Sequence, residues 1–259
     1  MVPSSRRVFL ASASTVVVGA GGGLLGGACG GEGAKAPPGA ARLTGAHEKV
    51  GGEDQGEDVG AVEDLMREHG VLRRAIIVYR ESASRLRGSR GEASTVPPDV
   101  LGRTARLFRS FGEDYHERKL EETYIFPAVR RAGGAAGNDI DTLLAQHQRG
   151  RQITDTIEAV AQAGKLVANA VVLADMLDAF TRMYESHMAI EDTLVFPAWK
   201  KTMSRKALEE LGDKFEDIEK ATFGKDGFDE GVAQMTAIEG MLGIASLAKF
   251  TAPPPPRLT

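Results

Sequence analysis

An internal repeat constrains the fold of this chain more than any other feature of its sequence. The segment EETYIFPA at residues 121–128 recurs as EDTLVFPA at residues 191–198, an offset of 70 residues. Single histidines upstream of the two copies, His69 and His147, complete the repeat of a helix pair. We therefore expect two related pairs of helices.

Apolar residues recur at steps of three and four along four segments, which is the period of amphipathic helices. The first segment covers residues 62–86, and the second runs from the prolines at 97 and 98 to about residue 131. The third begins after the glycines at 133, 134 and 137 and reaches residue 161, and the fourth covers residues 173–198. Because short loops join these segments, the sequence predicts an all-α, up-down-up-down four-helix bundle over residues 59–202. Two shorter amphipathic helices are expected over residues 203–248, before a proline-rich tail at 249–259.

The first 58 residues carry a different signal. Ser5-Arg6-Arg7-Val8-Phe9-Leu10 leads into a stretch without charge that ends at Gly31, and residues 1–29 read as a twin-arginine signal peptide. The stretch Leu-Leu-Gly-Gly-Ala before Cys29 resembles a lipoprotein signal, so lipidation at Cys29 and ordinary cleavage after Ala36 are alternatives. Residues 30–58, rich in Gly, Ala, Pro and acidic residues, are expected to form a flexible linker. We therefore expect export across the cytoplasmic membrane to a periplasmic or extracytoplasmic location, with membrane contact only through the signal peptide or a lipid anchor.

Charge and cysteine content narrow the classes of function. The chain has 32 Lys and Arg against 36 Asp and Glu, and residues 1–29 hold two of the arginines and no acid. The remainder is acidic, which argues against a nucleic-acid partner. Since there is a single cysteine, a zinc ribbon and a CxxC redox pair are excluded. A metal ion would have to be held by histidines and carboxylates.

Polar side chains on the inner faces of the predicted helices are candidates for a metal site. The single histidines of the first and third helices lie about eight residues from their starts, and an acid lies about ten residues before the end of the second and fourth. In an antiparallel bundle these positions fall in one layer, roughly 12 to 15 Å from the same end. Two further histidines lie near this layer. The candidate ligands are His69, His116, Glu121, His147, His187 and Glu191.

Two carboxylates and four imidazoles buried at one level need a compensating partner, and no Lys or Arg occupies the clear inner positions of this layer. A bound cation would supply it. Imidazole and carboxylate without thiolate suit iron, manganese or zinc. Because each carboxylate can bridge two ions while two histidines complete each ion, we favour a dinuclear iron centre with two iron ions per chain.

Four motifs with their spacing carry a family resemblance. They are Glu68-His69-x-x-Leu72-Arg73-Arg74, His116 with Glu121-Glu122-x-x-Ile125-Phe126-Pro127, Gln146-His147, and His187-x-x-x-Glu191-Asp192-x-x-Val195-Phe196-Pro197. With them the chain resembles the hemerythrin family, in its HHE cation-binding branch, over residues 60–202. The resemblance implies a left-handed four-helix bundle with a non-heme di-iron centre that binds dioxygen, nitric oxide or peroxide, or that stores and senses iron.

The chain departs from the family pattern at two places. Oxygen-carrying hemerythrins have a second histidine one turn after the residue that corresponds to His147, and here that place is Arg151, which puts simple reversible oxygen carriage in doubt. The family also has His-x-x-x-Glu in the second helix, whereas Glu121 lies five residues after His116. A one-residue bulge would restore the geometry. The alternative is that Glu117 or Glu122 is the ligand.

The remaining predictions concern charged residues near the candidate ligands and the alternative classes of protein. Glu122 and Asp192 are interpreted as supporting or surface carboxylates, and the pairs Arg73-Arg74 and Arg130-Arg131 as solvated helix faces. A ferritin-like protein would need paired Glu-x-x-His motifs, and only Glu113-x-x-His116 fits. Because the sequence shows no substrate pocket, binding or sensing of a small diatomic ligand or peroxide ranks above a redox enzyme, and a metal-free structural or interaction bundle is the third class.

Overall fold

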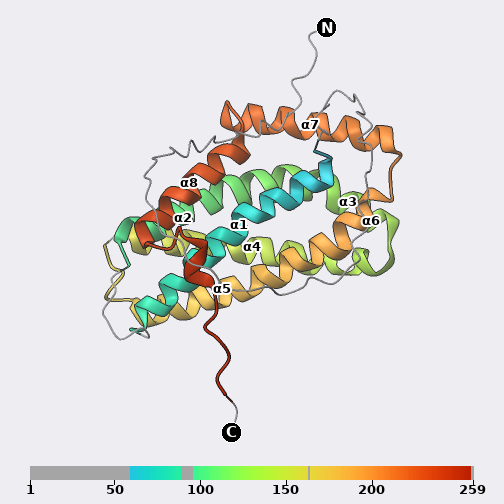
Figure 1. The fold of residues 1–259 in the computed structure, drawn as a ribbon. Coiled ribbons are helices and arrows are strands. Elements are labelled where there is room, and N and C mark those ends of the chain that lie inside the picture. The colour runs from blue at the N-terminus through green and yellow to red at the C-terminus, as the bar shows by residue number, and fades with distance from the viewer. Residues whose placement is uncertain (1–58, 89–95, 163, 258–259) are drawn as a thin grey trace, which may run out of the picture. The chain divides into compact units, whose positions relative to one another are not determined.

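The computed structural model describes residues 59–88, 96–162 and 164–257, and all regular structure within these ranges is helical (Figure 1). The predicted signal peptide, Cys29 and the linker lie outside the described residues. Among the helices that are described, none is both long and apolar enough to span a membrane.

Four antiparallel helical rods form the predicted bundle. The first is α1 (Ala61–Leu86) and the third is α4 (Gly134–Gln162). The second consists of α2 (Pro98–Leu107), η1 (Phe108–Ile125) and α3 (Phe126–Ala132), and the fourth of α5 (Ala170–Ile190), η2 (Glu191–Val195) and α6 (Phe196–Lys200). The all-α bundle is thus confirmed, with α1 packed on α5 and α2 on α4.

Two further helices, α7 (Arg205–Phe223) and α8 (Gly227–Leu242), lie against α1 and the second rod (Figure 1). Each starts at a side-chain cap, since Ser204 and Asp226 accept hydrogen bonds from backbone amides of the first turn. Gly224 ends α7 with a left-handed backbone (φ 70°), a conformation that glycine adopts without steric cost. A short 3₁₀ turn, η3 (Leu247–Phe250), follows at the border of the predicted tail.

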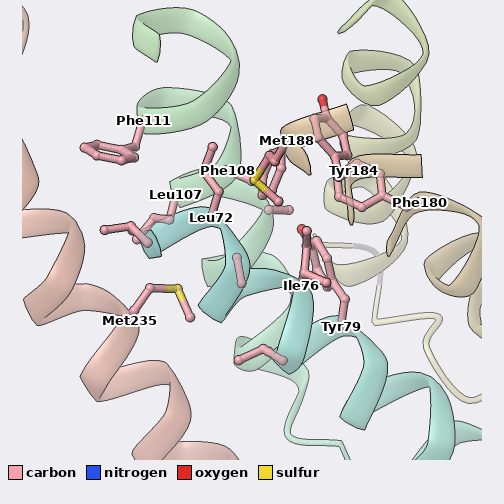
Figure 2. Close-up of a cluster of buried hydrophobic side chains, with 14 of the residues drawn as sticks. Leu72, Ile76, Tyr79, Leu107, Phe108, Phe111, Phe180, Tyr184, Met188 and Met235 are labelled. Carbon is pink, nitrogen blue, oxygen red and sulfur yellow. The ribbon is translucent and has the colours of Figure 1, made fainter. Parts of the chain in front are cut away.

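A dense apolar core fills the bundle beside the polar layer. Tyr79 and Phe108 both pack edge-on against Phe180, with ring centroids 5.4 and 5.0 Å from the Phe180 ring (Figure 2). Leu72 and Ile76 of α1 are buried in the same cluster. Because burial of apolar surface is the main favourable term in folding, this core can hold the helices in place around the polar layer.

The second and fourth rods change their helical hydrogen bonding next to the predicted ligands. In η1 and η2 the helix is of the π type, and each segment closes with a bond between residues five apart, from the Phe126 amide to Glu121 and from the Phe196 amide to Glu191. With this wider turn, Glu121 shares a face with His116 although five residues separate them. The predicted local widening of the second helix is therefore confirmed. Its length of 18 residues in η1, and the second π segment, were not expected.

Candidate metal centre

The structure brings all six predicted side chains into one buried layer. None of them is more than 3% exposed. The histidines come from α1, η1, α4 and α5, one from each rod of the bundle, and the two acids come from the π segments. The predicted convergence of the four rods at this level is thus observed.

Two pairs of histidines face each other across the layer. The Nε2 atoms of His69 and His116 are 3.0 Å apart. Glu121 Oε1 lies 3.3 Å from His116 Nε2, and Glu191 Oε2 lies 3.6 Å from His69 Nε2. We call this group the His69 half-site.

The second pair repeats the arrangement with the other oxygens of the same acids. The Nε2 atoms of His147 and His187 are also 3.0 Å apart. Glu121 Oε2 lies 3.4 Å from His147 Nε2, and Glu191 Oε1 lies 3.2 Å from His187 Nε2. We call this group the His147 half-site. Each acid therefore presents one oxygen to each half-site.

The donor set fits a pair of cations. All four carboxylate oxygens of Glu121 and Glu191 are buried and have no hydrogen-bond partner within the described residues. Buried polar atoms nearly always have a hydrogen-bond partner or a metal ion beside them. These four oxygens at one level therefore indicate a site for a cation. Glu121, His147, His187 and Glu191 bring their ligand atoms within 4.8 Å of one another, as do His69, His116 and Glu121, so each group could hold a metal ion.

Burial and the neighbouring charges shift the pKa values of the candidate ligands, upward for Glu191, His116 and His147 and downward for Glu121, His69 and His187. Burial, together with the charge of Glu121, raises the pKa of Glu191 well above its ordinary value. Although burial opposes it, the carboxylates of Glu121 and Glu68 raise the pKa of His116 well above its ordinary value. Metal ligands must give up such protons, so a cation would replace positive charge that the carboxylates already attract.

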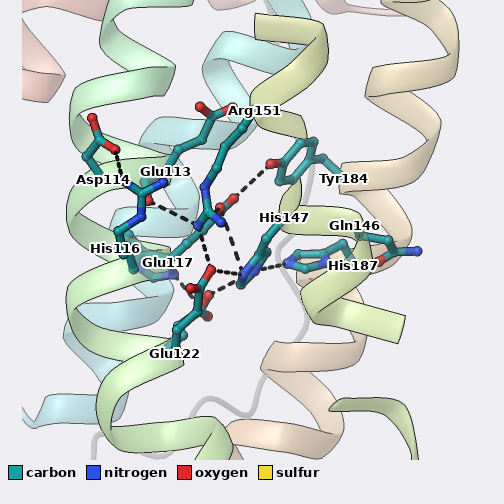
Figure 3. A network of polar contacts seen from close by, with 12 residues as sticks. Glu113, Asp114, His116, Glu117, Glu122, Gln146, His147, Arg151, Tyr184 and His187 are labelled. Atoms are coloured by element: carbon teal, nitrogen blue, oxygen red, sulfur yellow. Dashed lines mark hydrogen bonds and ion pairs between the residues drawn. The ribbon is translucent and has the colours of Figure 1, made fainter. Parts of the chain in front are cut away.

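The opposite nitrogen of every imidazole is also held. Each Nδ1 atom lies 2.6 to 2.9 Å from a side-chain oxygen on another rod of the bundle, which fixes the ring so that Nε2 points into the layer. Figure 3 shows two of these contacts, those of His147 with Glu122 and of His187 with Gln146. The four pairs are His69 with Asp192, His116 with Glu68, His147 with Glu122, and His187 with Gln146. Of the two interpretations of Glu122 and Asp192, as supporting or as surface carboxylates, these contacts favour the first.

Two arginines correct the interpretation made from the sequence. Arg73 forms an ion pair with Asp192, and Arg151 lies 2.5 Å from Glu122, so each supports the acid that holds a histidine. Arg73 is thus not simply a solvated residue, and Arg74 pairs with Glu239 of α8. Arg151 is only 14% exposed and contacts Glu117 and Glu122 on the Nδ1 side of His147, so a basic residue lies beside the layer although none lies among the six candidate ligands.

The alternative ligands in the second rod lie elsewhere. Glu117 accepts a hydrogen bond from the Tyr184 hydroxyl at 2.8 Å and another from Arg151 at 3.0 Å (Figure 3). Its nearest approach to a histidine is 3.9 Å, to Nδ1 of His147 rather than to Nε2. Glu122 also contacts the Nδ1 side. Of the three candidate acids, only Glu121 lies between the two histidine pairs.

The repeated Phe-Pro motif closes the layer on one side. Phe196 stacks on His69 and Phe126 stacks on His147, each with ring centroids 5.3 Å apart. Both phenylalanines are buried and follow the π segments directly. The motif therefore shields the imidazoles, a role that its sequence alone did not indicate.

A buried acid beside the layer, Glu113, is expected to make the stability of the fold depend on pH. Burial raises its pKa from 4.5 to about 7. Because the folded state holds this proton more strongly than the unfolded state, we expect the contribution of Glu113 to stability to be full below about pH 4.5 and to be lost as the pH rises through about 7. The difference corresponds to at most about 3 kcal/mol.

We predict that Glu113→Gln removes this dependence. In metal-free protein, urea unfolding from pH 5 to 8 should show the variant gaining stability over the unmodified protein as pH rises. The exposed Asp114→Asn is the control, and it should change the free energy of unfolding by less than about 1 kcal/mol at each pH. A constant difference between Glu113→Gln and the unmodified protein would show that Glu113 does not titrate in this range.

Comparison with known proteins agrees with this geometry. Residues 60–199 match the family model of the hemerythrin HHE cation-binding domain, and the chain belongs to this family. Uncharacterized proteins of Mycobacterium tuberculosis and Mycobacterium bovis are each 41% identical to the chain over 201 residues, which covers 76% of both sequences. No solved structure was found to match the chain.

Proposed function

We propose that this protein binds a dinuclear non-heme iron centre in the layer between Glu121 and Glu191. The observation that carries the proposal is the set of four buried carboxylate oxygens without partners, each directed to an imidazole pair. Two nitrogens and two oxygens per ion, with no thiolate, suit iron, and they leave coordination positions open for a small ligand. When bound, such a centre would supply reversible ligand binding or electron transfer.

We propose that the centre binds or senses dioxygen, nitric oxide or peroxide, or that the protein handles iron. A surface pocket of about 440 Å³ supports access, because its lining includes Glu122 and Phe126, both of which contact His147. None of the six candidate ligands lines the pocket, and each of them is at most 3% exposed. We therefore rank binding above turnover of peroxide or nitric oxide. From the predicted signal peptide, we propose that the protein works outside the cytoplasmic membrane.

Iron content tests this proposal. After anaerobic reconstitution with ferrous iron and removal of excess, elemental analysis should give about two iron ions per chain. Oxidation should then produce near-ultraviolet and visible absorbance, which the metal-free protein lacks. Less than half an ion per chain would support the metal-free structural bundle instead. Sustained breakdown of peroxide above the rate of free iron would support the enzyme.

A further inference from the structure

The two half-sites are related by the internal repeat, but one of their supporting contacts differs in charge. Glu68 and Gln146 occupy equivalent positions, each directly before the ligand histidine of its helix. Glu68 Oε2 lies 2.6 Å from Nδ1 of His116, and the amide oxygen of Gln146 lies 2.8 Å from Nδ1 of His187. With Nε2 reserved for a metal ion, Nδ1 carries the proton and donates it. One imidazole is thus held by a carboxylate and its counterpart by a neutral amide.

The surroundings of Glu68 keep it a strong acceptor. It is 1% exposed, and its second oxygen accepts a hydrogen bond from the buried Tyr115 hydroxyl at 2.9 Å. A charge acts more strongly in the protein interior than at the surface. Gln146, by contrast, is half-buried. The carboxylate therefore acts on its imidazole where water screens it least.

The arginines add to the difference between the half-sites. Arg73, which pairs with the Asp192 carboxylate of the His69 half-site, has a side chain that is 43% exposed. Arg151, which pairs with Glu122 of the His147 half-site, is 14% exposed. Since a buried cation offsets a carboxylate more than a solvated one does, Glu122 is the weaker acceptor.

Glu117 does not supply the His147 half-site with a second carboxylate acceptor. Both of its oxygens are engaged, one by the Tyr184 hydroxyl and one by Arg151. At 3.9 Å from Nδ1 of His147, it accepts no hydrogen bond from a ligand histidine. In the His69 half-site both imidazoles donate to carboxylates, whereas in the His147 half-site only one does.

We infer that the His69 half-site binds its metal ion first and more tightly, and that Glu68 is the positioning residue responsible. A carboxylate that accepts the imidazole N–H makes the ring a better electron donor, and loss of such a partner typically lowers metal affinity about 10- to 100-fold. The inference rests on the proposed function, because it concerns the same two ions. It adds that the second ion is the exchangeable one.

An anaerobic titration of the full chain with ferrous iron against a competing chelator tests the inference. The unmodified protein should load in two steps of different affinity. Glu68→Gln, which keeps the shape of the side chain, should weaken the first step about 10- to 100-fold. Gln146→Glu should strengthen the second step by at least about 10-fold and leave the first unchanged.

A pair of equivalent histidine variants assigns the steps to the half-sites. His147→Ala should keep one tightly bound ion, whereas His69→Ala should keep only a weakly bound one. Two equal steps in the unmodified protein, equal weakening of both steps by Glu68→Gln, or the same result for both histidine variants would overturn the inference. These outcomes would contradict the order of binding but not the dinuclear site. Failure of the unmodified protein to bind iron would contradict the proposed function itself.

Discussion

Replacing Glu191 with Ala is expected to abolish binding of both iron ions. The physical reason is that its two oxygens serve different half-sites, at 3.6 Å from His69 Nε2 and 3.2 Å from His187 Nε2. Removal leaves each ion with one carboxylate oxygen and leaves the buried layer with excess positive charge, which is costly in a low-dielectric interior. Elemental analysis after reconstitution should fall from about two ions per chain to nearly none, a larger loss than either single histidine variant produces.

Glu117→Gln is the matched control for this prediction. Glu117 is also buried and lies on the same helical rod as Glu121, but its oxygens bind Tyr184 and Arg151. The variant should retain both ions. If Glu117→Gln lost the metal while Glu191→Ala kept it, the acids of the site would have been assigned wrongly.

Gly150→Ala is expected to destabilise the protein by about 1 to 3 kcal/mol through overpacking. A Cβ atom at this position would lie 2.0 Å from the Tyr184 hydroxyl oxygen and 2.8 Å from its Cζ atom. The ring would have to move, and its hydrogen bond to the buried Glu117 would break. Chemical denaturation at a single pH, with circular dichroism as the readout, measures the loss.

Gly70→Ala provides the control, because its Cβ atom would have no neighbour within 4 Å. This change in the middle of α1 should raise stability by about 0.5 to 1 kcal/mol, the usual gain of alanine over glycine in a helix. In a Tyr184→Leu background, where the clash is absent, Gly150→Ala should cost less stability than it does in the unmodified protein. A Gly150→Ala variant as stable as the unmodified protein would show that Tyr184 has room to move.

The sequence was sufficient to predict the helices and the six residues of the layer, because both follow from local patterns. Apolar spacing marks each rod, and the repeat aligns Glu121 with Glu191. The extent of the π-helix could not be predicted in this way. It depends on how the second rod packs against its neighbours, and the sequence showed only that Glu121 was displaced by one residue from the expected place.

The supporting contacts were harder to predict because they join residues distant in the sequence. His69 and Asp192 are 123 residues apart, and their hydrogen bond exists only because α1 packs beside the fourth rod. One local signal was available. Arg73 and Arg151 each lie four residues after a ligand histidine, and this spacing places them on the same helix face. Arg73 was interpreted as a solvated residue because of its charge, and Arg151 only as the place where oxygen-carrying hemerythrins have a histidine.

The position of the metal is the most direct test of the account. Crystals of the iron-loaded protein, measured at the iron absorption edge, would show each ion as an anomalous scattering peak. We predict two peaks between Glu121 and Glu191, one beside the Nε2 atoms of His69 and His116 and the other beside those of His147 and His187. A single peak, or a peak beside Glu117 and Glu122 on the Nδ1 side of His147, would contradict the dinuclear site.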